Sequence, residues 1–274
     1  MYGTVWVVAT PLGNLGDFSP RARQTLEEAD VILAEDTRRA GRLLHLAGIV
    51  NKRFLSLHEH NEEERINEVL GLLRSGAKVA VVSDAGTPLI ADPGYRLVAA
   101  CREGGIPVVP VPGPCAPIAA LMASGLPPYP FVFLGFLPRK AGDVRSLFRE
   151  YAMVTATLVF FERKNRVGQS LALALDVLGE REFCLARELT KKHEQFINGR
   201  LGQPLDVAGE LLGEVTVVIG PPHAERAASR EEVLDLARAY AGMRPKDAAR
   251  LIHSRVSGWT VKGIYEVMLE QGVE

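Results

Sequence analysis

The sequence predicts an α/β protein with two α/β domains followed by a small helical appendage. Short apolar runs alternate with segments of helical periodicity along most of the chain. A stretch with three prolines in six residues, 125–130, interrupts this alternation, which then starts again. After the pair Pro221–Pro222 the strand-like runs stop. We therefore predict domains at residues 1–125, 131–222 and 228–274.

The first predicted domain alternates strictly between strands and helices. Ser19 and Pro20 mark the start of its first helix, because serine caps helix N-termini and proline fits the first turn. The predicted strands cover 4–10, 31–34, 53–58, 78–82 and 107–113. The later helices are predicted near 39–46, 61–73, 95–101 and 119–124. This alternation is typical of a parallel sheet with crossover helices.

The strand at 78–82 leads into the best candidate for a ligand site. It lacks polar alternation, so we expect it to be buried on both faces. In the loop that follows, Gly86 lets a ligand approach the backbone, and Asp84 can accept hydrogen bonds. We expect Asp92 and Pro93 to begin the next helix as N-cap and first-turn residue. Ligands in open α/β sheets bind at the carboxyl ends of strands; an ordinary strand-to-helix loop is the alternative.

The second predicted domain is richer in strands and poorer in helices. Its strands are predicted at 131–137, 155–161, 182–188, 194–201 and 214–219. Its helices are predicted near 142–151, 165–178 and 205–212. Because the strands are denser here and the helices fewer, we expect a mixed sheet that is partly antiparallel.

The tail is predicted to form three short helices at 230–241, 246–254 and 261–270. Within it, the segment 244–262 has a net charge of +4, from five basic residues and the single acid Asp247. The basic residues are Arg244, Lys246, Arg250, Arg255 and Lys262. Together with Trp259, they predict a nucleic-acid-binding surface. A solvated helical face is the alternative.

Composition excludes several classes of protein. A net charge of −1 gives no global attraction to nucleic acid or membranes. The three cysteines are odd in number and widely spaced, which favours reduced thiols in a cytoplasmic protein over a disulfide framework or a zinc site. No basic region precedes the first strand, and no apolar run is long enough to span a membrane. We therefore expect neither a signal peptide nor a membrane segment.

The sequence lacks the familiar motifs of other enzyme classes. Gly13 and Gly16 have the wrong spacing for a dinucleotide-binding loop, and no phosphate-binding loop ending in Gly-Lys-Ser/Thr is present. His58 and His60 lack an evident third metal ligand and lie among acidic residues, so we expect no metal site. Dehydrogenase and hydrolase activities therefore lose their usual sequence support.

Five stretches carry a recognisable pattern when taken together. They are VATPLGNL (8–15), AEDTR (34–38), SDAGTPLI with DPG (83–94), VPGPCA (111–116) and RELTKK (187–192). In this order and spacing they resemble the tetrapyrrole-methylase superfamily and, more narrowly, its ribosomal RNA branch. The resemblance covers nearly the whole chain, including the helical tail.

The resemblance implies an S-adenosylmethionine-dependent methyltransferase with two α/β domains of the tetrapyrrole-methylase type and a cofactor cleft between them. Homodimers are usual in the superfamily. The ribosomal branch methylates the 2′-oxygen of a cytidine ribose in small-subunit ribosomal RNA. The implied partner is therefore this RNA, in the assembled small subunit.

The resemblance also implies which residues bind the cofactor. They are Pro11, Asp84, Ala85, Gly86, Thr87, Leu89, Ile90, Cys115, Ala116, Phe161 and Glu162. The chain departs from the family after Glu162, where the usual Ser-x-His-Arg is replaced by the sequence RKNR (163–166). Only the final arginine, Arg166, is kept. The replacement makes the segment after Glu162 more basic than in the family.

Methyl transfer to a ribose hydroxyl needs a group that accepts the hydroxyl proton, such as a carboxylate or a neutral lysine. Asp36, Glu188 and Lys191 lie at predicted strand ends and are the candidates for this role. Arg38 and Arg187, with the five basic residues of the tail, are candidates for binding RNA phosphates. A structural ion pair between Glu188 and Arg187 is the alternative.

Two other functions stay open at this point. One is methylation of a tetrapyrrole or corrin precursor, as elsewhere in the superfamily. The other is a non-catalytic RNA-binding factor that retains the fold. The AEDTR stretch and the basic tail favour the RNA methyltransferase, and the intact cofactor loop argues against the non-catalytic factor.

Overall fold

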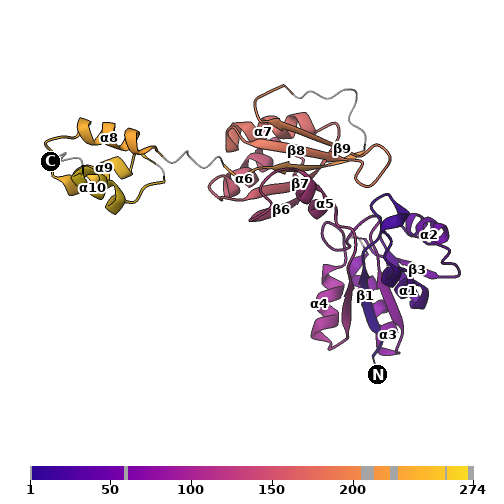
Figure 1. Cartoon of the computed structure of the whole chain (residues 1–274). Coiled ribbons are helices and arrows are strands. Elements are labelled where there is room, and N and C mark those ends of the chain that lie inside the picture. The colour runs from indigo at the N-terminus through magenta and orange to yellow at the C-terminus, as the bar shows by residue number, and fades with distance from the viewer. Residues whose placement is uncertain (1, 59–60, 205–212, 223–227, 257, 271–274) are drawn as a thin grey trace. The chain divides into compact units, whose positions relative to one another are not determined.

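The computed structural model describes residues 2–58, 61–204, 213–222, 228–256 and 258–270. The chain forms two compact units, Met1–Gly220 and Pro221–Glu274. In the part that the model describes, the larger unit contains two five-stranded sheets, and the smaller unit is helical (Figure 1). These elements confirm the predicted α/β class with a helical tail. The bounds of three separate domains stay a prediction.

The first sheet is entirely parallel, as predicted, with the order β3-β2-β4-β1-β5. Its strands are β1 (Thr4–Val8), β2 (Val31–Ala34), β3 (Arg53–Ser56), β4 (Lys78–Val81) and β5 (Val108–Val111). Three of the four residues of β4 are buried, which follows from its continuous apolar run and its central place in the sheet.

Crossover helices cover both faces of this sheet. They are α1 (Pro20–Glu28), α2 (Thr37–Leu46), α3 (Glu62–Arg74) and α4 (Tyr95–Glu103), with a short 3₁₀ helix at Leu15–Asp17. One core joins the sheet to α1 and α2 through Leu26 and Leu44, and the other joins it to α3 and α4 through Leu73 and Leu97. The sheet is therefore doubly wound, with apolar side chains packed on each face.

The loops after β1 and β4 lie side by side at one edge of this sheet. The connection after β1 runs through α1, and the connection after β4 runs through α4 on the opposite face. Thr10 and Gly86 join the two loops by a pair of backbone hydrogen bonds of 2.8 and 3.1 Å. Neighbouring strands whose connections leave on opposite faces form the crevice in which ligands bind in such sheets.

The second sheet is mixed, as predicted, with the order β6-β7-β10-β8-β9. Its strands are β6 (Phe131–Phe136), β7 (Thr157–Arg163), β8 (Glu182–Arg187), β9 (Gln195–Arg200) and β10 (Glu214–Ile219). β6 and β7 are parallel, and the other neighbours are antiparallel. The helix predicted at 205–212 lies outside the described residues.

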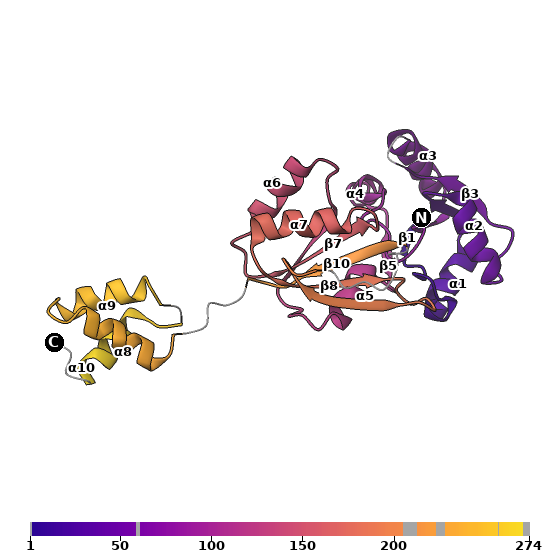
Figure 2. The ribbon, with the colours of Figure 1, turned by 90° about the horizontal axis from the view of Figure 1, so that it is seen from above.

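Different helices cover the two faces of the second sheet. α6 (Ala141–Tyr151) and α7 (Val167–Leu178) pack on one face around Phe148 and Phe160. α5 (Ala116–Ala123) packs on the other face through Ala120 and Leu121, as Figure 2 shows. α5 follows the first sheet in the sequence but contacts the second, so it carries the chain from one sheet to the other.

One predicted helix start is wrong. Asp92 and Pro93 do not begin α4; Gly94 is its N-cap, with φ of +121°. A glycine adopts this positive φ without the steric cost that a Cβ would bring, so the chain turns into the helix there. Asp92 is left in the preceding loop, where its carboxyl group is available to the ligand site described below.

In its described residues, the smaller unit packs three helices around an apolar core. They are α8 (Arg230–Ala239), α9 (Pro245–His253) and α10 (Val261–Glu270), close to the predicted bounds. Ser229 and Glu232 form a reciprocal capping box at the start of α8. No helix in the described part of the chain combines the length and apolarity needed to cross a membrane.

Candidate functional site

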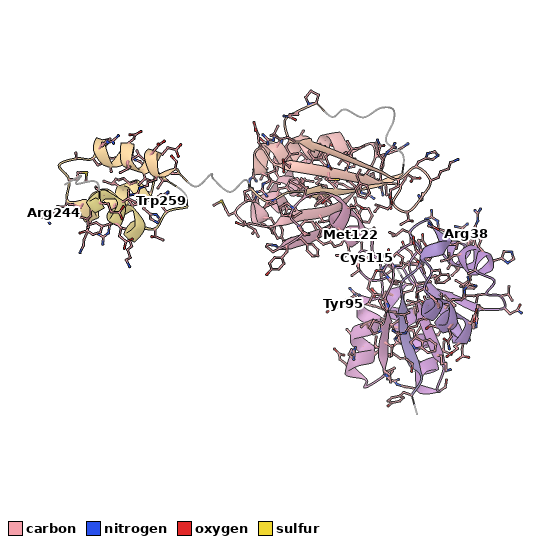
Figure 3. The ribbon with its side chains drawn as sticks, in the orientation of Figure 1. Arg38, Tyr95, Cys115, Met122, Arg244 and Trp259 are labelled. Carbon is pink, nitrogen blue, oxygen red and sulfur yellow. The ribbon has the colours of Figure 1, made fainter. Side chains whose placement is uncertain are left out.

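A cavity of about 620 Å³ lies in the larger unit and is lined by loops of the first sheet and strands of the second. This volume is within the range of roughly 300–1,000 Å³ that small-molecule sites occupy. Most of the predicted cofactor-binding residues line it. These are Asp84, Ala85, Gly86, Thr87, Ile90, Cys115, Ala116 and Phe161. Cys115, at the N-cap of α5, is labelled in Figure 3.

The loop after β4 forms one wall of the cavity, and two neighbouring segments hold it in place. The Thr10–Gly86 backbone bridge ties it to the loop after β1, and the hydroxyl of Thr87 donates to Pro114 O at 2.9 Å. Gly86 has φ of +81°, and a Cβ built there would lie 2.9 Å from Cδ2 of Leu12. The positive φ favours glycine at this position, and a Cβ would also have to displace the end of the Leu12 side chain.

Asp84 presents a carboxylate oxygen that no described residue satisfies. Its Oδ2 accepts a 2.9 Å hydrogen bond from Nη1 of Arg39. Its Oδ1 is buried, and no donor among the described residues lies within hydrogen-bonding distance of it. Buried polar atoms are normally paired, so Asp84 keeps one acceptor that the described residues leave unused, while the residue itself lines the cavity.

Carboxylates give the cavity a negative potential. Asp92 lines it, and burial together with the nearby charges of Glu35, Asp84 and Glu214 raises the pKa of the Asp92 carboxyl to about 6. Arg39 and Lys191 are the cations of the described lining, and each pairs with one carboxylate. The balance favours a ligand that carries positive charge.

The second sheet forms the opposite wall with alternate residues of its strands. Thr216 of β10 lies opposite Phe161 of β7 and Ala186 of β8 in the strand register, and all three line the cavity. Glu188 follows β8 on the same face. Because side chains alternate across a sheet, their neighbours in sequence point to the core beneath α6 and α7.

Two predicted residues lie on that opposite face. Oε2 of Glu162 accepts a 2.6 Å hydrogen bond from the Ser170 hydroxyl, and the residue is 1% exposed. Nε of Arg187 donates to Oε1 of Gln195 at 2.8 Å. Neither belongs to the cavity lining. The strand period of two explains this outcome, since Phe161 and Glu188, one position away from each, do line the cavity.

Glu188 and Lys191 form an ion pair at the cavity wall, with Nζ of Lys191 2.9 Å from Oε1 of Glu188. A Cβ at Gly13 would lie 2.5 Å from Cγ of Lys191, and one at Gly213 would lie 2.5 Å from Oε1 of Glu188. Glycines in two other loops therefore make room for the pair. Glu188 itself has φ of +49°. Non-glycine residues with such strained backbone angles cluster at functional sites.

Asp36 lies in an adjoining hollow with Arg38 and Arg39, rather than in the lining of the main cavity. Its Oδ1 accepts from the backbone N–H of Arg38 at 2.9 Å, so Asp36 is the N-cap of α2. Hydrogen bonds from the Arg38 side chain and backbone hold the pKa of the Asp36 carboxyl at about 2. A carboxylate with so low a pKa is a weak proton acceptor.

Pro11 and Leu89 are not in the lining of the cavity either, although residues beside each of them are. Pro11 is buried next to the Thr10–Gly86 bridge, and Leu89 packs in the core beneath α3 and α4 with φ of +70°. Both therefore shape the loops that carry the lining residues.

The five basic residues of the tail are all exposed on the helical unit. Arg250 and Lys262 lie near carboxylates, at 4.0 Å from Asp247 and 3.7 Å from Glu266. Trp259 differs from the expected surface aromatic. It packs against the apolar core of this unit, and its Nε1–H donates to Ala228 O at 2.6 Å. The basic surface of α9 and its flanks is thus built without it.

Several lining residues are absent from the sequence prediction. Among them are Leu12, Arg39, Asp92, Phe136, Glu214 and Thr216. Glu214 and Thr216 belong to β10, which is antiparallel to β7 and β8. Its first residues therefore lie beside the carboxyl ends of β7 and β8. A search restricted to the carboxyl ends of strands misses them, because they lie at the start of β10. The alternating pattern of β10 was the available signal.

The chain matches the family model described as tetrapyrrole (corrin/porphyrin) methylases over residues 4–205. It is 43% identical over 271 residues to a ribosomal RNA small subunit methyltransferase I of Micromonospora olivasterospora, covering 96% of this chain and 86% of that protein. It is 42% identical to a protein of the same name from Escherichia coli O157:H7, covering 98% and 96%.

Solved structures share the fold. A crystal structure of uroporphyrin-III C-methyl transferase from Thermus thermophilus, complexed with S-adenyl homocysteine, matches with a TM-score of 0.56 and 21% identity. The match covers 80% of this chain and 97% of that chain. At this identity the likeness concerns the arrangement of sheets and helices.

Proposed function

Since the chain belongs to the tetrapyrrole methylase family, we propose that it transfers a methyl group from S-adenosylmethionine to small-subunit ribosomal RNA. We propose further that the acceptor is the 2′-oxygen of a cytidine ribose. The observation that carries the cofactor assignment is the cavity at the crevice of the doubly wound sheet, which is lined by the carboxylate residues Asp84, Asp92 and Glu214.

The residues present fit this cofactor. S-adenosylmethionine carries an amine that donates hydrogen bonds and a sulfonium with a positive charge. The carboxylate of Asp84 in the lining provides an acceptor, and the carboxylates of Asp92 and Glu214 provide a negative surrounding. The glycine at position 86 leaves backbone exposed to a ligand without a Cβ in the way. Asp84–Thr87, Ile90 and Cys115 would hold the cofactor.

When bound, the cofactor supplies an activated methyl group, and the protein has to position the acceptor and remove its proton. We assign proton removal to Glu188, whose carboxylate lies in the cavity wall. The ammonium of Lys191, 2.9 Å from that carboxylate, orients it and offsets the charge of a nearby phosphate. Asp36 takes a different role, because it caps α2 and holds Arg38 in place.

The acceptor RNA is a polyanion, so the protein needs exposed cations outside the cavity. The side chain of Arg38 is 90% exposed in the hollow that adjoins the cavity. Arg38 is labelled in Figure 3, as is Arg244, one of the five basic residues of the helical unit. We propose that these side chains bind phosphates, and that the assembled small subunit presents the target nucleotide as an unpaired base.

We also propose that the protein works as a cytoplasmic homodimer. The exposed apolar side chains of α5 support self-association: Ile118 is 44% and Met122 79% exposed, one turn apart on the same helix face. Met122 is labelled in Figure 3. Apolar side chains gathered on a helix face are typical of surfaces that a partner covers.

Methyl transfer from radiolabelled S-adenosylmethionine tests this function. Small ribosomal subunits, naked small-subunit RNA and a tetrapyrrole precursor are offered in parallel. Label in the RNA of the subunits is the expected result. Label in the tetrapyrrole alone would contradict the RNA assignment, and a protein that binds no cofactor would contradict the assignment of the cavity.

A further inference from the structure

Phe136 reaches the cavity through an irregularity in β6. Between Phe133 and Phe136 the strand register with β7 shifts, because Phe133 lies opposite Val159 whereas Phe136 lies opposite Phe161. Three steps along β6 thus match two steps along β7. Gly135, with φ of +66°, supplies the extra residue of this β-bulge.

The bulge changes the face on which Phe136 lies. In a regular strand, positions 134 and 136 would share a face, and Leu134 packs with the core beneath α6 and α7. The inserted residue turns Phe136 to the other face, where it lines the cavity with Phe161. The ring centroids of Phe136 and Phe161 are 5.1 Å apart at an interplanar angle of 53°.

The chain after Phe136 is fixed as well. Leu137 is 4% exposed and belongs to the core beneath α6 and α7. Nη2 of Arg166 donates to Pro138 O at 2.6 Å and lies 3.6 Å from Oε2 of the buried Glu162. This arginine is the one residue of the family's Ser-x-His-Arg pattern that the chain keeps. The cavity-facing ring is therefore held by anchored residues on the opposite face.

The Phe136 ring contacts Phe161, yet the residue is still 48% exposed. A large apolar ring held at a cavity wall, with half its surface open, leaves a flat face for a planar ligand. Stacking on an aromatic side chain recognises a nucleobase whatever its sequence identity. Resting on the function proposed above, we propose that Phe136 is the stacking platform for a nucleobase in this cavity.

Two nucleobases belong to the proposed reaction, the adenine of the cofactor and the base of the target nucleotide. Each has its own measurement. The dissociation constants of S-adenosylmethionine and S-adenosylhomocysteine, from calorimetry, report on adenine. Filter binding to small ribosomal subunits, together with KM for the subunits, reports on the target base.

The variants are Phe136→Leu and Phe136→Trp, with Phe131→Leu as the control. Phe131 is on the same strand and 40% exposed, but it does not line the cavity. Leucine keeps apolar bulk and loses the aromatic face, whereas tryptophan restores a face. A thermal melt of each variant establishes that it is folded.

We expect Phe136→Leu to weaken one of the two affinities by about tenfold relative to wild type. In Phe136→Trp, which keeps an aromatic face, the same affinity should stay close to the wild-type value. Phe131→Leu should leave both affinities within about twofold. Loss in the calorimetric measurement assigns the platform to adenine, and loss in the subunit measurement assigns it to the target base. Unchanged affinities in Phe136→Leu, or a loss that Phe136→Trp does not repair, would overturn the proposal.

These outcomes are separable from failure of the proposed function. If the wild-type protein binds the cofactor but methylates no ribosomal RNA, the acceptor assignment fails. The calorimetric comparison of the same variants still decides whether Phe136 stacks on adenine.

Discussion

Nζ of Lys191 lies 2.9 Å from Oε1 of Glu188, and Gly13 and Gly213 leave the space that this pair occupies. Lys191 lies beside Gly13 in the loop after β1 of the first sheet, while Glu188 directly follows β8 of the second. The pair therefore lies where loops of both sheets meet at the cavity. This position is the basis for assigning proton removal to Glu188.

Replacing Glu188 by glutamine should reduce kcat about 100-fold, because the amide cannot accept the ribose proton. The amide is close in size to the carboxylate, so the dissociation constant of S-adenosylmethionine should stay within about threefold. Single-turnover methyl transfer and calorimetry measure the two quantities. A Glu188→Gln protein with wild-type kcat would remove this residue from the reaction.

Asp36→Asn is the matched control. Asparagine caps helices about as well as aspartate, and the low pKa of Asp36 argues against proton transfer. We expect kcat within about threefold of wild type, since capping of α2 is preserved and the ion pair with Arg38 that is lost is an exposed one. A large loss of kcat with an unchanged melting temperature would instead return Asp36 to the list of proton acceptors.

Gly86→Ala should weaken cofactor binding by about tenfold or more, since a Cβ there lies 2.9 Å from Leu12 and the φ of +81° strains any L side chain. Gly105→Ala is the matched control, because Gly105 has φ of +66° with nothing within 4 Å of its Cβ. Both changes should cost about 1 kcal/mol of stability. Only Gly86→Ala should change the calorimetric affinity; equal affinities would show that this loop does not face the cofactor.

Asp92→Asn should stabilise the protein without cofactor, by an amount that grows from about pH 4 and is complete above a pH of about 6. Burial and the charges of Glu35, Asp84 and Glu214 raise the pKa of the Asp92 carboxyl from 3.8 to about 6. Between these values the folded state holds a proton that the unfolded state has lost, so wild-type stability falls as the pH rises. Above pH 6 the charged form is disfavoured in the fold.

Thermal melts from pH 4 to pH 8 measure this effect. The melting temperature of Asp92→Asn should exceed that of wild type at pH 8, and the difference should vanish towards pH 4, where the wild-type carboxyl is neutral in the fold. A constant difference across the range would contradict the electrostatic origin. Glu63→Gln, with a side chain 88% exposed and outside the cavity, is the control.

Replacing Arg244 and Lys246 by alanine should weaken binding of small subunits and flatten its dependence on salt. Each lost phosphate contact lowers the slope of log affinity against log salt by about one. Arg238→Ala is the control, since Arg238 is on α8 of the same unit, pairs with Asp235, and lies outside the basic segment. An unchanged slope in the double variant would show that this face does not contact RNA.

Local sequence patterns predicted the elements of the fold well because burial and capping are local properties. The continuous apolar runs of β2 and β4 and the Ser19–Pro20 helix start appear as expected. The start of α4 differs because Gly94 takes a positive φ that outweighs the capping preference of Asp92. This backbone conformation depends on the packing of Gly94 against Leu57 and Leu89. Leu57 is distant in the sequence, so the local pattern does not reveal this contact.

The loop after β4 was predictable as one wall of the cavity, whereas the wall formed by the second sheet was predictable only in part. Asp84 and Gly86 lie in one loop, so their motif is visible along the sequence. Glu162 was expected in the cavity and lies on the opposite face, because strand alternation decides its side. Phe136 enters only through the register shift at Gly135, and no alternating pattern reveals an inserted residue. Trp259, read as a surface aromatic, packs inward against its own unit.

The nucleoside formed by the reaction tests the central claim most directly. Small ribosomal subunits that lack the modification are incubated with the protein and S-adenosylmethionine, and the RNA is digested to nucleosides for mass spectrometry. The account predicts 2′-O-methylcytidine. In undigested RNA, the phosphodiester linkage that follows this nucleotide should resist alkaline cleavage. A methyl group on a base, or none in RNA from a reaction in which cofactor binding has been measured, would contradict it.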